Sequence, residues 1–262
     1  MSVLQKDTLE ITTNVGCAID CSYCPQEVLV HRYGNQKRFM DEHDFKLLLL
    51  GVSRTTAIHF SGMAEPFLND GSASSMIRLA HDAGHVVSVF TTTVGMSDSD
   101  WPNLSGIPFY DFVVHLPSEE NKENIPLTTK LLGNLQWIKH NVTNAKFLCF
   151  GTPPNVVGAL IGNERLKRIK IKPRAGLVAQ SQRHAGPIEC GRSIERNVVL
   201  PNGTVLLCCQ DYGMRHVLGN LRSNTLGGIR NGDEMLKVRD GMKDDTKDIL
   251  CRTCELAAHR NP

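Results

Sequence analysis

Three cysteines near the N-terminus constrain this chain more than any other feature. They fall within eight residues, as Cys17-Ala-Ile-Asp-Cys21-Ser-Tyr-Cys24. The chain has nine cysteines in 262 residues, and the other six are Cys149, Cys190, Cys208, Cys209, Cys251 and Cys254. An odd number cannot pair completely within one chain, and clustered cysteines in a chain of this length indicate metal binding more than a disulfide framework.

The N-terminus and the composition limit the compartment and the partners. Residues 1–7 have no apolar signal core, and no run approaches the roughly 18 apolar residues of a membrane span. We therefore expect a reducing, cytoplasmic location. The net charge of +2 gives no reason to expect a nucleic-acid or membrane partner. A hydrophobic content of 41% is typical of a globular protein and argues against disorder.

Up to about residue 174, short β-branched or aromatic runs alternate with helix-like stretches. The expected strands are Leu9–Val15, Ala57–Ser61, Val86–Thr92, Asp111–Leu116, Ala145–Phe150 and Arg168–Lys172. Helices are expected from Asp41 as cap to Leu50, over Ser72–Ala83 and over Thr128–His140. This α/β alternation predicts a parallel sheet with right-handed crossovers. Six strands rather than eight leave a partial, open (β/α)6 barrel, with its active site at the carboxyl ends of the strands.

The pattern changes after Gly176. Two apolar runs, Asn197–Leu200 and Thr204–Leu207, flank Pro201-Asn202-Gly203, and Asn-Gly between apolar runs predicts a β-hairpin. A helix is expected around Gly232–Met242, before a terminal Cys-x2-Cys. We expect two domains, a barrel over residues 1–178 and a small cysteine-bearing hairpin/helix domain over residues 179–262.

The N-terminal cysteine loop follows the first strand directly. Three thiolates so close together can ligate three irons of a cubane cluster and leave the fourth iron without a protein ligand. An open coordination position is where a small molecule can bind. The alternatives are a zinc knuckle that lacks one ligand, or three incidental thiols.

At these residues the chain resembles the radical S-adenosylmethionine (SAM) superfamily, whose signature is Cys-x3-Cys-x-aromatic-Cys, with Tyr23 as the aromatic. The resemblance implies a [4Fe-4S] cluster on Cys17, Cys21 and Cys24, with S-adenosylmethionine (AdoMet) on the open iron. Ser61-Gly62-Met63-Ala64-Glu65-Pro66 resembles the family's Gly-Gly-Glu-Pro segment, although Met63 and Ala64 replace the usual small residues. The cofactor-binding residues that the resemblance implies are Tyr23, Gly62, Glu65, Thr91, Thr93, His115 and Ser118.

A second set of cysteines lies in the C-terminal region. Cys190, Cys208, Cys251 and Cys254 supply four thiolates, and their spacing alone leaves structural zinc and an iron-sulfur cluster open. The region resembles the auxiliary-cluster domains of SPASM and twitch radical enzymes, which implies a second [4Fe-4S] cluster on these four. Six cysteines after the first motif are too few for two further clusters. Cys209 is then a spare, and Cys149 a buried small residue within a strand.

Among twitch enzymes the chain is similar to the butirosin-pathway type of aminocyclitol dehydrogenase, which oxidises an alcohol to a ketone. This implies oxidation of a small polar substrate, sugar-like or cyclitol-like, in which the auxiliary cluster takes one electron. The expected substrate residues are Arg174, Gln210 and Asp211. An acidic residue stands in that dehydrogenase where this chain has Gln210, so the same substrate is not expected. A flavodoxin-type or ferredoxin-type electron donor is implied.

Two other functions stay open. One is radical modification of a ribosomally made peptide by epimerisation, crosslinking or side-chain oxidation. Such enzymes often carry a leader-recognition domain ahead of the barrel, although that domain can be a separate protein. Only 16 residues precede Cys17, which favours the small molecule. The other is a metal-stabilised binding protein without catalysis, against which the intact cysteine loop and Glu65 argue.

Overall fold

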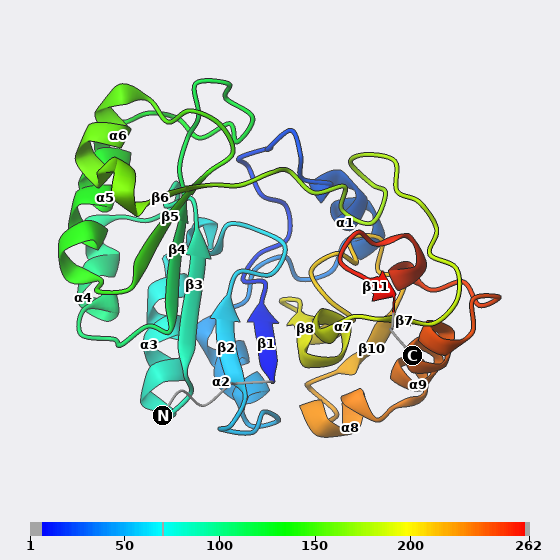
Figure 1. The fold of residues 1–262 in the computed structure, drawn as a ribbon. Coiled ribbons are helices and arrows are strands. Elements are labelled where there is room, and N and C mark those ends of the chain that lie inside the picture. Colours follow the sequence, from blue (N-terminus) through cyan, green and yellow to red (C-terminus); the bar gives the residue numbers. More distant parts are fainter. Residues whose placement is uncertain (1–6, 70, 260–262) are drawn as a thin grey trace.

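The computed structural model describes residues 7–69 and 71–259. Its main element is a nine-stranded sheet of order β10-β9-β8-β1-β2-β3-β4-β5-β6 (Figure 1). The strands of this sheet are β1 Thr8–Ile11, β2 Ala57–Phe60, β3 Val87–Thr91, β4 Asp111–His115, β5 Ala145–Cys149, β6 Leu166–Arg168, β8 Arg196–Val199, β9 Thr204–Leu206 and β10 Val217–Asn220. A second, two-stranded sheet pairs β7 Ile188–Glu189 with β11 Ala258–His259.

Helices α3 to α6 lie beside strands β3 to β6, and helices α7 to α9 lie near strands β8 and β10 (Figure 1). They are α1 Gln26–Tyr33, α2 Glu42–Leu49, α3 Ser72–Asp82, α4 Trp101–Leu104, α5 Thr129–Asn141, α6 Asn155–Ile161, α7 Gly191–Glu195, α8 Leu226–Arg230 and α9 Asp233–Lys243. None of the helices described is long and apolar enough to cross a membrane.

Strands β1 to β6 pair in chain order, and every pair is parallel. This confirms the expected partial barrel of alternating strands and helices. Alternate residues of the first two strands, Ile11, Ile58 and Phe60, belong to the apolar core. The residues between them point to the other face because side chains alternate along a strand, and they include Glu10 and His59, which are both buried.

Helix ends follow the capping signals. The Asp41 carboxylate accepts from the Asp44 N–H at 2.8 Å and begins α2, and the Thr128 hydroxyl accepts from the Leu131 N–H at 3.1 Å and begins α5. Helix α3 is followed by Gly84 at φ +89°, as a left-handed glycine cap requires.

The last expected barrel strand, Arg168–Lys172, is wrong in position. Strand β6 spans Leu166–Arg168 and pairs with the end of β5, with Arg168 opposite Cys149. One further bond, from the Ile169 N–H to the Cys149 carbonyl at 3.0 Å, ends the ladder. Strand β5 ends at Cys149, so residues 170–172 have no neighbouring strand there and do not extend the sheet.

The C-terminal hairpin continues the barrel sheet. Strand β8 pairs in parallel with β1 and antiparallel with β9. The hairpin turn contains Gly203 at φ +87°, as the Asn-Gly signal predicts. The second cysteine region is therefore joined to the first cysteine loop through one continuous sheet.

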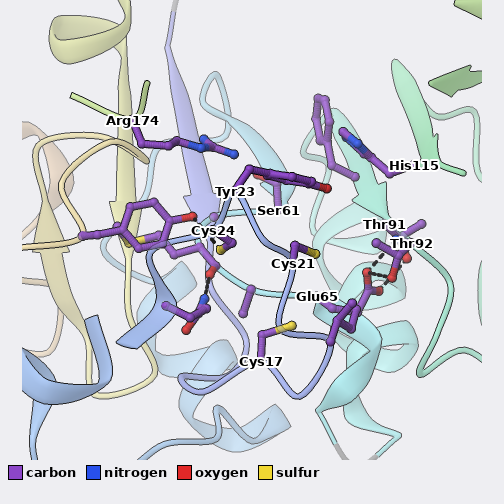
Figure 2. A pocket seen from close by; sticks show the side chains of 17 residues that line it. Cys17, Cys21, Tyr23, Cys24, Ser61, Glu65, Thr91, Thr92, His115 and Arg174 are labelled. Atoms are coloured by element: carbon purple, nitrogen blue, oxygen red, sulfur yellow. Dashed lines mark hydrogen bonds between the residues drawn. The ribbon is translucent and has the colours of Figure 1, made fainter. Parts of the chain in front are cut away.

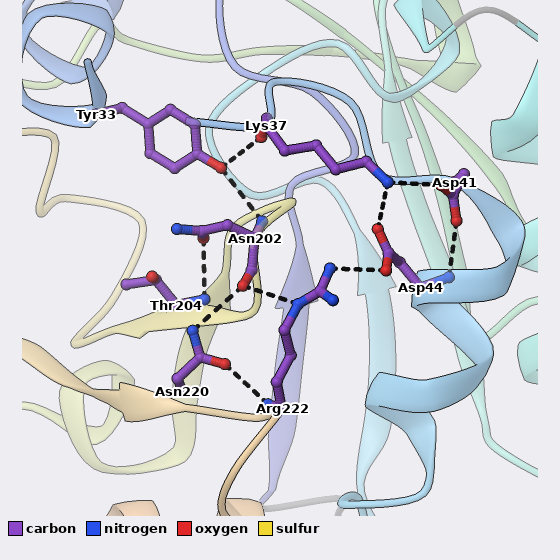
Figure 3. A network of polar contacts seen from close by, with 8 residues as sticks. All are labelled: Tyr33, Lys37, Asp41, Asp44, Asn202, Thr204, Asn220 and Arg222. Carbon is purple, nitrogen blue, oxygen red and sulfur yellow. Dashed lines mark hydrogen bonds and ion pairs between the residues drawn. The ribbon is translucent and has the colours of Figure 1, made fainter. Parts of the chain in front are cut away.

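A polar network also holds this turn against α1 and α2 (Figure 3). The Tyr33 hydroxyl donates to the Lys37 carbonyl at 2.6 Å and accepts from the Asn202 N–H at 3.2 Å. Asp44, only 8% exposed at its side chain, pairs with Lys37 at 2.5 Å and with Arg222 at 2.7 Å. These contacts fix the C-terminal hairpin relative to the start of the barrel.

Candidate active site

A pocket lies at the carboxyl ends of the first barrel strands, beside the loop that follows β1 (Figure 2). Segments from both parts of the chain line it. The lining residues are Cys17, Ile19, Cys21, Tyr23, Cys24, Gln26, Ser61, Gly62, Met63, Ala64, Glu65, Phe90, Thr91, Thr92, His115, Arg174 and Tyr212.

All three cysteines of the N-terminal loop face this pocket. The Cys24 N–H donates to the Cys21 carbonyl at 3.0 Å and forms a tight turn. Burial raises the pKa of Cys17 and of Cys24, and raises that of Cys21 to about 12. Thiols in this setting stay protonated at neutral pH unless a cation stabilises the thiolate. Three thiols with a shared opening therefore fit a cluster with one open iron.

Glu65 forms another part of the pocket wall, in the loop after β2. Its buried carboxylate accepts from the Thr91 hydroxyl at 2.5 Å, the Thr92 N–H at 2.6 Å and the Thr92 hydroxyl at 2.7 Å. Burial raises its pKa, while these donors oppose the rise. The carboxylate is thus fixed in orientation toward the pocket and suits a bound ammonium group.

Gly62 shapes the same wall. It has φ +56°, and a Cβ there would overlap the Thr12 side chain, whose hydroxyl accepts from the Met63 N–H at 3.1 Å. Only glycine meets both conditions. The loop can therefore pass close to β1 and present Glu65 to the pocket.

The other expected cofactor residues divide into two groups. Thr91 and His115 line the pocket, and burial lowers the pKa of His115 to about 4, so its imidazole is neutral at pH 7. Thr93 and Ser118 are outside the lining. Thr93 has φ +63°, which turns its side chain out of the strand alternation, and its buried hydroxyl has no partner among the described residues. Ser118 donates its hydroxyl to Glu123 at 2.6 Å.

Several lining residues were not among the expected site residues, and Ser61, Thr92 and Tyr212 are three polar examples. Ser61 and Thr92 lie directly beside the expected residues Gly62 and Thr91. The two-residue period of a strand selects Thr93 together with Thr91, but the positive φ of Thr93 breaks that alternation. Tyr212 comes from the C-terminal region, and its hydroxyl lies 3.7 Å from the Cys24 sulfur. No local sequence signal marks Tyr212, because its contact depends on how the hairpin packs on the barrel.

The four expected auxiliary cysteines form a second group. Burial raises the pKa of Cys251 to about 12, and the nearby Cys190 and Cys254 add to this rise. Burial also raises the pKa of Cys208, with contributions from Cys209 and from Cys251. The four thiols thus lie close enough to affect one another. Within residues 7–69 and 71–259, no three His, Cys, Asp or Glu side chains are arranged to hold a single metal ion.

Cys209 directly follows Cys208 in the sequence and contacts Arg192. Its sulfur accepts from Arg192 Nη1 at 3.0 Å, and Arg192 also lies 3.5 Å from Glu10 on β1. Burial and the Glu10 charge raise the pKa of Cys209 to about 11. Cys149 is fully buried, with its sulfur 3.6 Å from the Pro117 carbonyl. These contacts favour the prediction that neither residue is a ligand.

Of the three expected substrate residues, the structure brings only Arg174 to the pocket. Asp211 is fully buried, and its two oxygens accept from the Arg215 N–H at 2.7 Å and the His216 N–H at 2.9 Å. It braces the loop after the hairpin. Gln210 is buried outside the lining, and its side-chain oxygen has no partner among the described residues.

Comparison with known proteins gives one family match. Residues 190–255 match the SPASM family, described as an iron-sulfur cluster-binding domain. No curated protein matches the chain by sequence.

Solved structures match nearly the whole chain at low identity. BtrN in complex with AdoMet and 2-DOIA is 17% identical, with a TM-score of 0.63 over 95% of this chain and 92% of BtrN. Streptococcus suis SuiB bound to precursor peptide SuiA is 12% identical, with a TM-score of 0.63 over 95% of this chain and 69% of SuiB. AdoMet-bound anSMEcpe is 14% identical, with a TM-score of 0.61 over 95% of this chain and 86% of anSMEcpe.

The chain therefore has the mixed α/β fold of radical SAM enzymes with SPASM or twitch domains. Its C-terminal segment, residues 190–255, matches the SPASM iron-sulfur cluster-binding domain. The expected resemblance is confirmed for the fold of the chain and for its C-terminal cysteine region.

Proposed function

We propose that this protein is a radical SAM oxidoreductase that oxidises a small polar substrate of the sugar or cyclitol type. The observation that carries the proposal is the pocket itself, in which three thiols and the fixed Glu65 carboxylate face Arg174 and Tyr212. The three cysteines and Glu65 suit a cluster with AdoMet, and Tyr212 comes from the region that holds the second cysteine group. A substrate in this pocket would lie between the AdoMet site and Tyr212.

The pocket residues have distinct roles in this proposal. Cys17, Cys21 and Cys24 would hold one [4Fe-4S] cluster, and Cys190, Cys208, Cys251 and Cys254 a second. When bound, the first cluster with AdoMet supplies a 5′-deoxyadenosyl radical that abstracts hydrogen, and the second supplies an acceptor for one electron. Glu65 would accept hydrogen bonds from the amino group of AdoMet. The neutral His115 would lie beside its ribose and carboxylate without adding charge.

Arg174 is the main candidate for binding substrate. Its guanidinium enters the pocket in Figure 2, and no ion pair engages it among residues 7–69 and 71–259. It offers several N–H donors to hydroxyl groups of a polar molecule. Met63, Phe90 and Tyr23 also line the pocket, and their apolar surfaces would help to exclude water from a reacting carbon.

Peptide modification is the second candidate. It is favoured by the similarity to SuiB bound to its precursor peptide and to anSMEcpe bound to AdoMet and the Cp18Cys peptide, at TM-scores of 0.63 and 0.55. In either case Glu65 and the cysteines would act in the same way, and only the substrate side of the pocket would differ.

A labelling experiment distinguishes the two candidates. The protein is reconstituted anaerobically with iron and sulfide, then incubated with AdoMet, dithionite and separate panels of deuterated cyclitols, deuterated sugars and peptides. We expect a cyclitol or sugar to raise 5′-deoxyadenosine formation and to transfer deuterium into it. Transfer only from a peptide would favour the second candidate. Reduced flavodoxin or ferredoxin in place of dithionite tests the expected electron donor.

A further inference from the structure

A carboxylate beside the last cysteine holds the loop that carries Arg174. Glu255 directly follows Cys254 in the sequence. Its Oε1 accepts from the Arg174 N–H at 3.2 Å, and its Oε2 accepts from the Ala175 N–H at 3.0 Å. Two successive backbone amides aimed at one carboxylate form an anion-binding turn, so a single side chain fixes both residues.

This loop has a backbone that needs such support. Arg174, Ala175 and Gly176 have φ values of +56°, +52° and +88°. Left-handed backbone is unfavourable for arginine and alanine because the Cβ approaches the following carbonyl. The turn is closed by bonds from the Leu177 N–H to the Arg174 carbonyl at 3.1 Å and from the Val178 N–H to the Pro173 carbonyl at 3.0 Å. Glu255 supplies two hydrogen bonds that tie this turn to the C-terminal region.

The two residues that Glu255 binds face different sites. The Arg174 side chain lines the pocket that holds Cys24 and Tyr212. The Ala175 side chain packs against Cys208 and Cys254 of the second cysteine group. A shift of Cys254 would therefore displace Glu255 and, through the two amides, would redirect Arg174.

We propose that Glu255 is a positioning residue that couples the state of the second cysteine group to Arg174 in the substrate pocket. In this arrangement, binding of the second cluster orders the 174–176 turn and sets the guanidinium in place. Substrate thus meets an ordered Arg174 only in protein whose second site is loaded. The inference rests on the proposed function, since it treats Cys254 as a cluster ligand and Arg174 as a substrate residue.

Hydrogen exchange in the reconstituted protein tests this coupling without knowledge of the substrate. The variants are Glu255→Ala, Glu255→Gln and Cys251→Ala, with Glu189→Ala as the matched control because its carboxylate has no hydrogen bond or ion pair among the described residues. The measured region is the peptide 173–179. Iron content and 5′-deoxyadenosine formation are measured in the same preparations.

We expect exchange at Arg174 and Ala175 to be about tenfold faster in Glu255→Ala, because both acceptors are lost. Glu255→Gln keeps one acceptor oxygen and should restore part of the protection. Cys251→Ala should accelerate the same peptide although Glu255 is present, and Glu189→Ala should not change it. Should Glu255→Ala not fold, Glu255→Gln and Cys251→Ala decide the outcome.

Wild-type exchange in both Glu255 variants would overturn the positioning role. Wild-type exchange in Cys251→Ala would overturn the coupling to the second site. Absence of 5′-deoxyadenosine from the wild-type protein would instead count against the proposed function, and the exchange data would still report on Glu255.

Discussion

Replacement of Glu65 by Gln separates a role in AdoMet binding from a role in the fold. The side chain is buried and accepts three hydrogen bonds of 2.5 to 2.7 Å from Thr91 and Thr92. Gln has nearly the same shape, and its oxygen can keep part of this network. The substitution removes the negative charge that would face the AdoMet ammonium group.

The expected size of the effect follows from these contacts. A hydrogen bond to a charged group contributes about 1.5–3 kcal/mol, so AdoMet affinity should fall by about 10- to 150-fold. The fold should lose only about 1–2 kcal/mol, because the amide nitrogen replaces one acceptor oxygen and leaves one backbone N–H, of Thr92 or of Phe67, without its acceptor. Burial raises the pKa of Glu65, and protonation removes the charge that binds ammonium. Wild-type affinity should therefore fall as the pH drops toward that raised pKa.

The assay is anaerobic calorimetric titration of the reconstituted protein with AdoMet at several pH values, together with thermal unfolding. Glu120→Gln is the control, because that carboxylate is exposed on the protein surface, where it accepts from the Thr152 N–H. An affinity for AdoMet within about twofold of wild type in Glu65→Gln would refute the assignment, since one charged hydrogen bond contributes more than that.

Three other substitutions test separate parts of the molecule. Cys208→Ser should lower the iron content from about eight to about four per chain while Cys209→Ser leaves it unchanged; equal losses in both would contradict the assignment of Cys208 as the ligand. Asp44→Asn should lower the unfolding free energy by about 1–2 kcal/mol and the melting temperature by about 2–8 °C. The control Glu42→Gln, which breaks an exposed pair with Lys46, should change little. If Asp44→Asn melted at the same temperature as wild type, the network in Figure 3 would not stabilise the hairpin. Asp211→Asn should cost about 1–3 kcal/mol by leaving one backbone N–H unpaired, yet keep AdoMet cleavage, and a loss of cleavage at unchanged stability would assign it a direct role instead.

Local patterns predicted much of the barrel. Strands β2 to β5 lie within the expected ranges, and the caps Asp41 and Thr128 begin their helices, because these signals depend on neighbouring residues alone. The pairing of β8 with β1 was not predictable, since no local pattern states which distant strand a hairpin will join. Strand β6 was misplaced for a similar reason, because the end of β5 decides where it can pair.

The site residues also fall into those that local sequence predicted and those that depend on tertiary contacts. The cysteine loop and Glu65 were found from spacing and resemblance, and the structure brings them into one pocket. Thr93 and Asp211 were expected there but are held elsewhere, one by a left-handed backbone and the other by two amide donors. Tyr212 was missed because its place depends on packing between the hairpin and the barrel. Contacts made across the fold decide which polar residues reach the pocket.

The central claim is that Cys17, Cys21 and Cys24 form a site at which AdoMet is reductively cleaved. The most direct measurement is 5′-deoxyadenosine formation by anaerobically reconstituted protein with dithionite, comparing wild type with the triple Cys→Ala variant and with Cys149→Ala. We predict that wild type and Cys149→Ala release 5′-deoxyadenosine and that the triple variant releases none. Continued formation in the triple variant, or none in the iron-loaded wild type, would contradict the account.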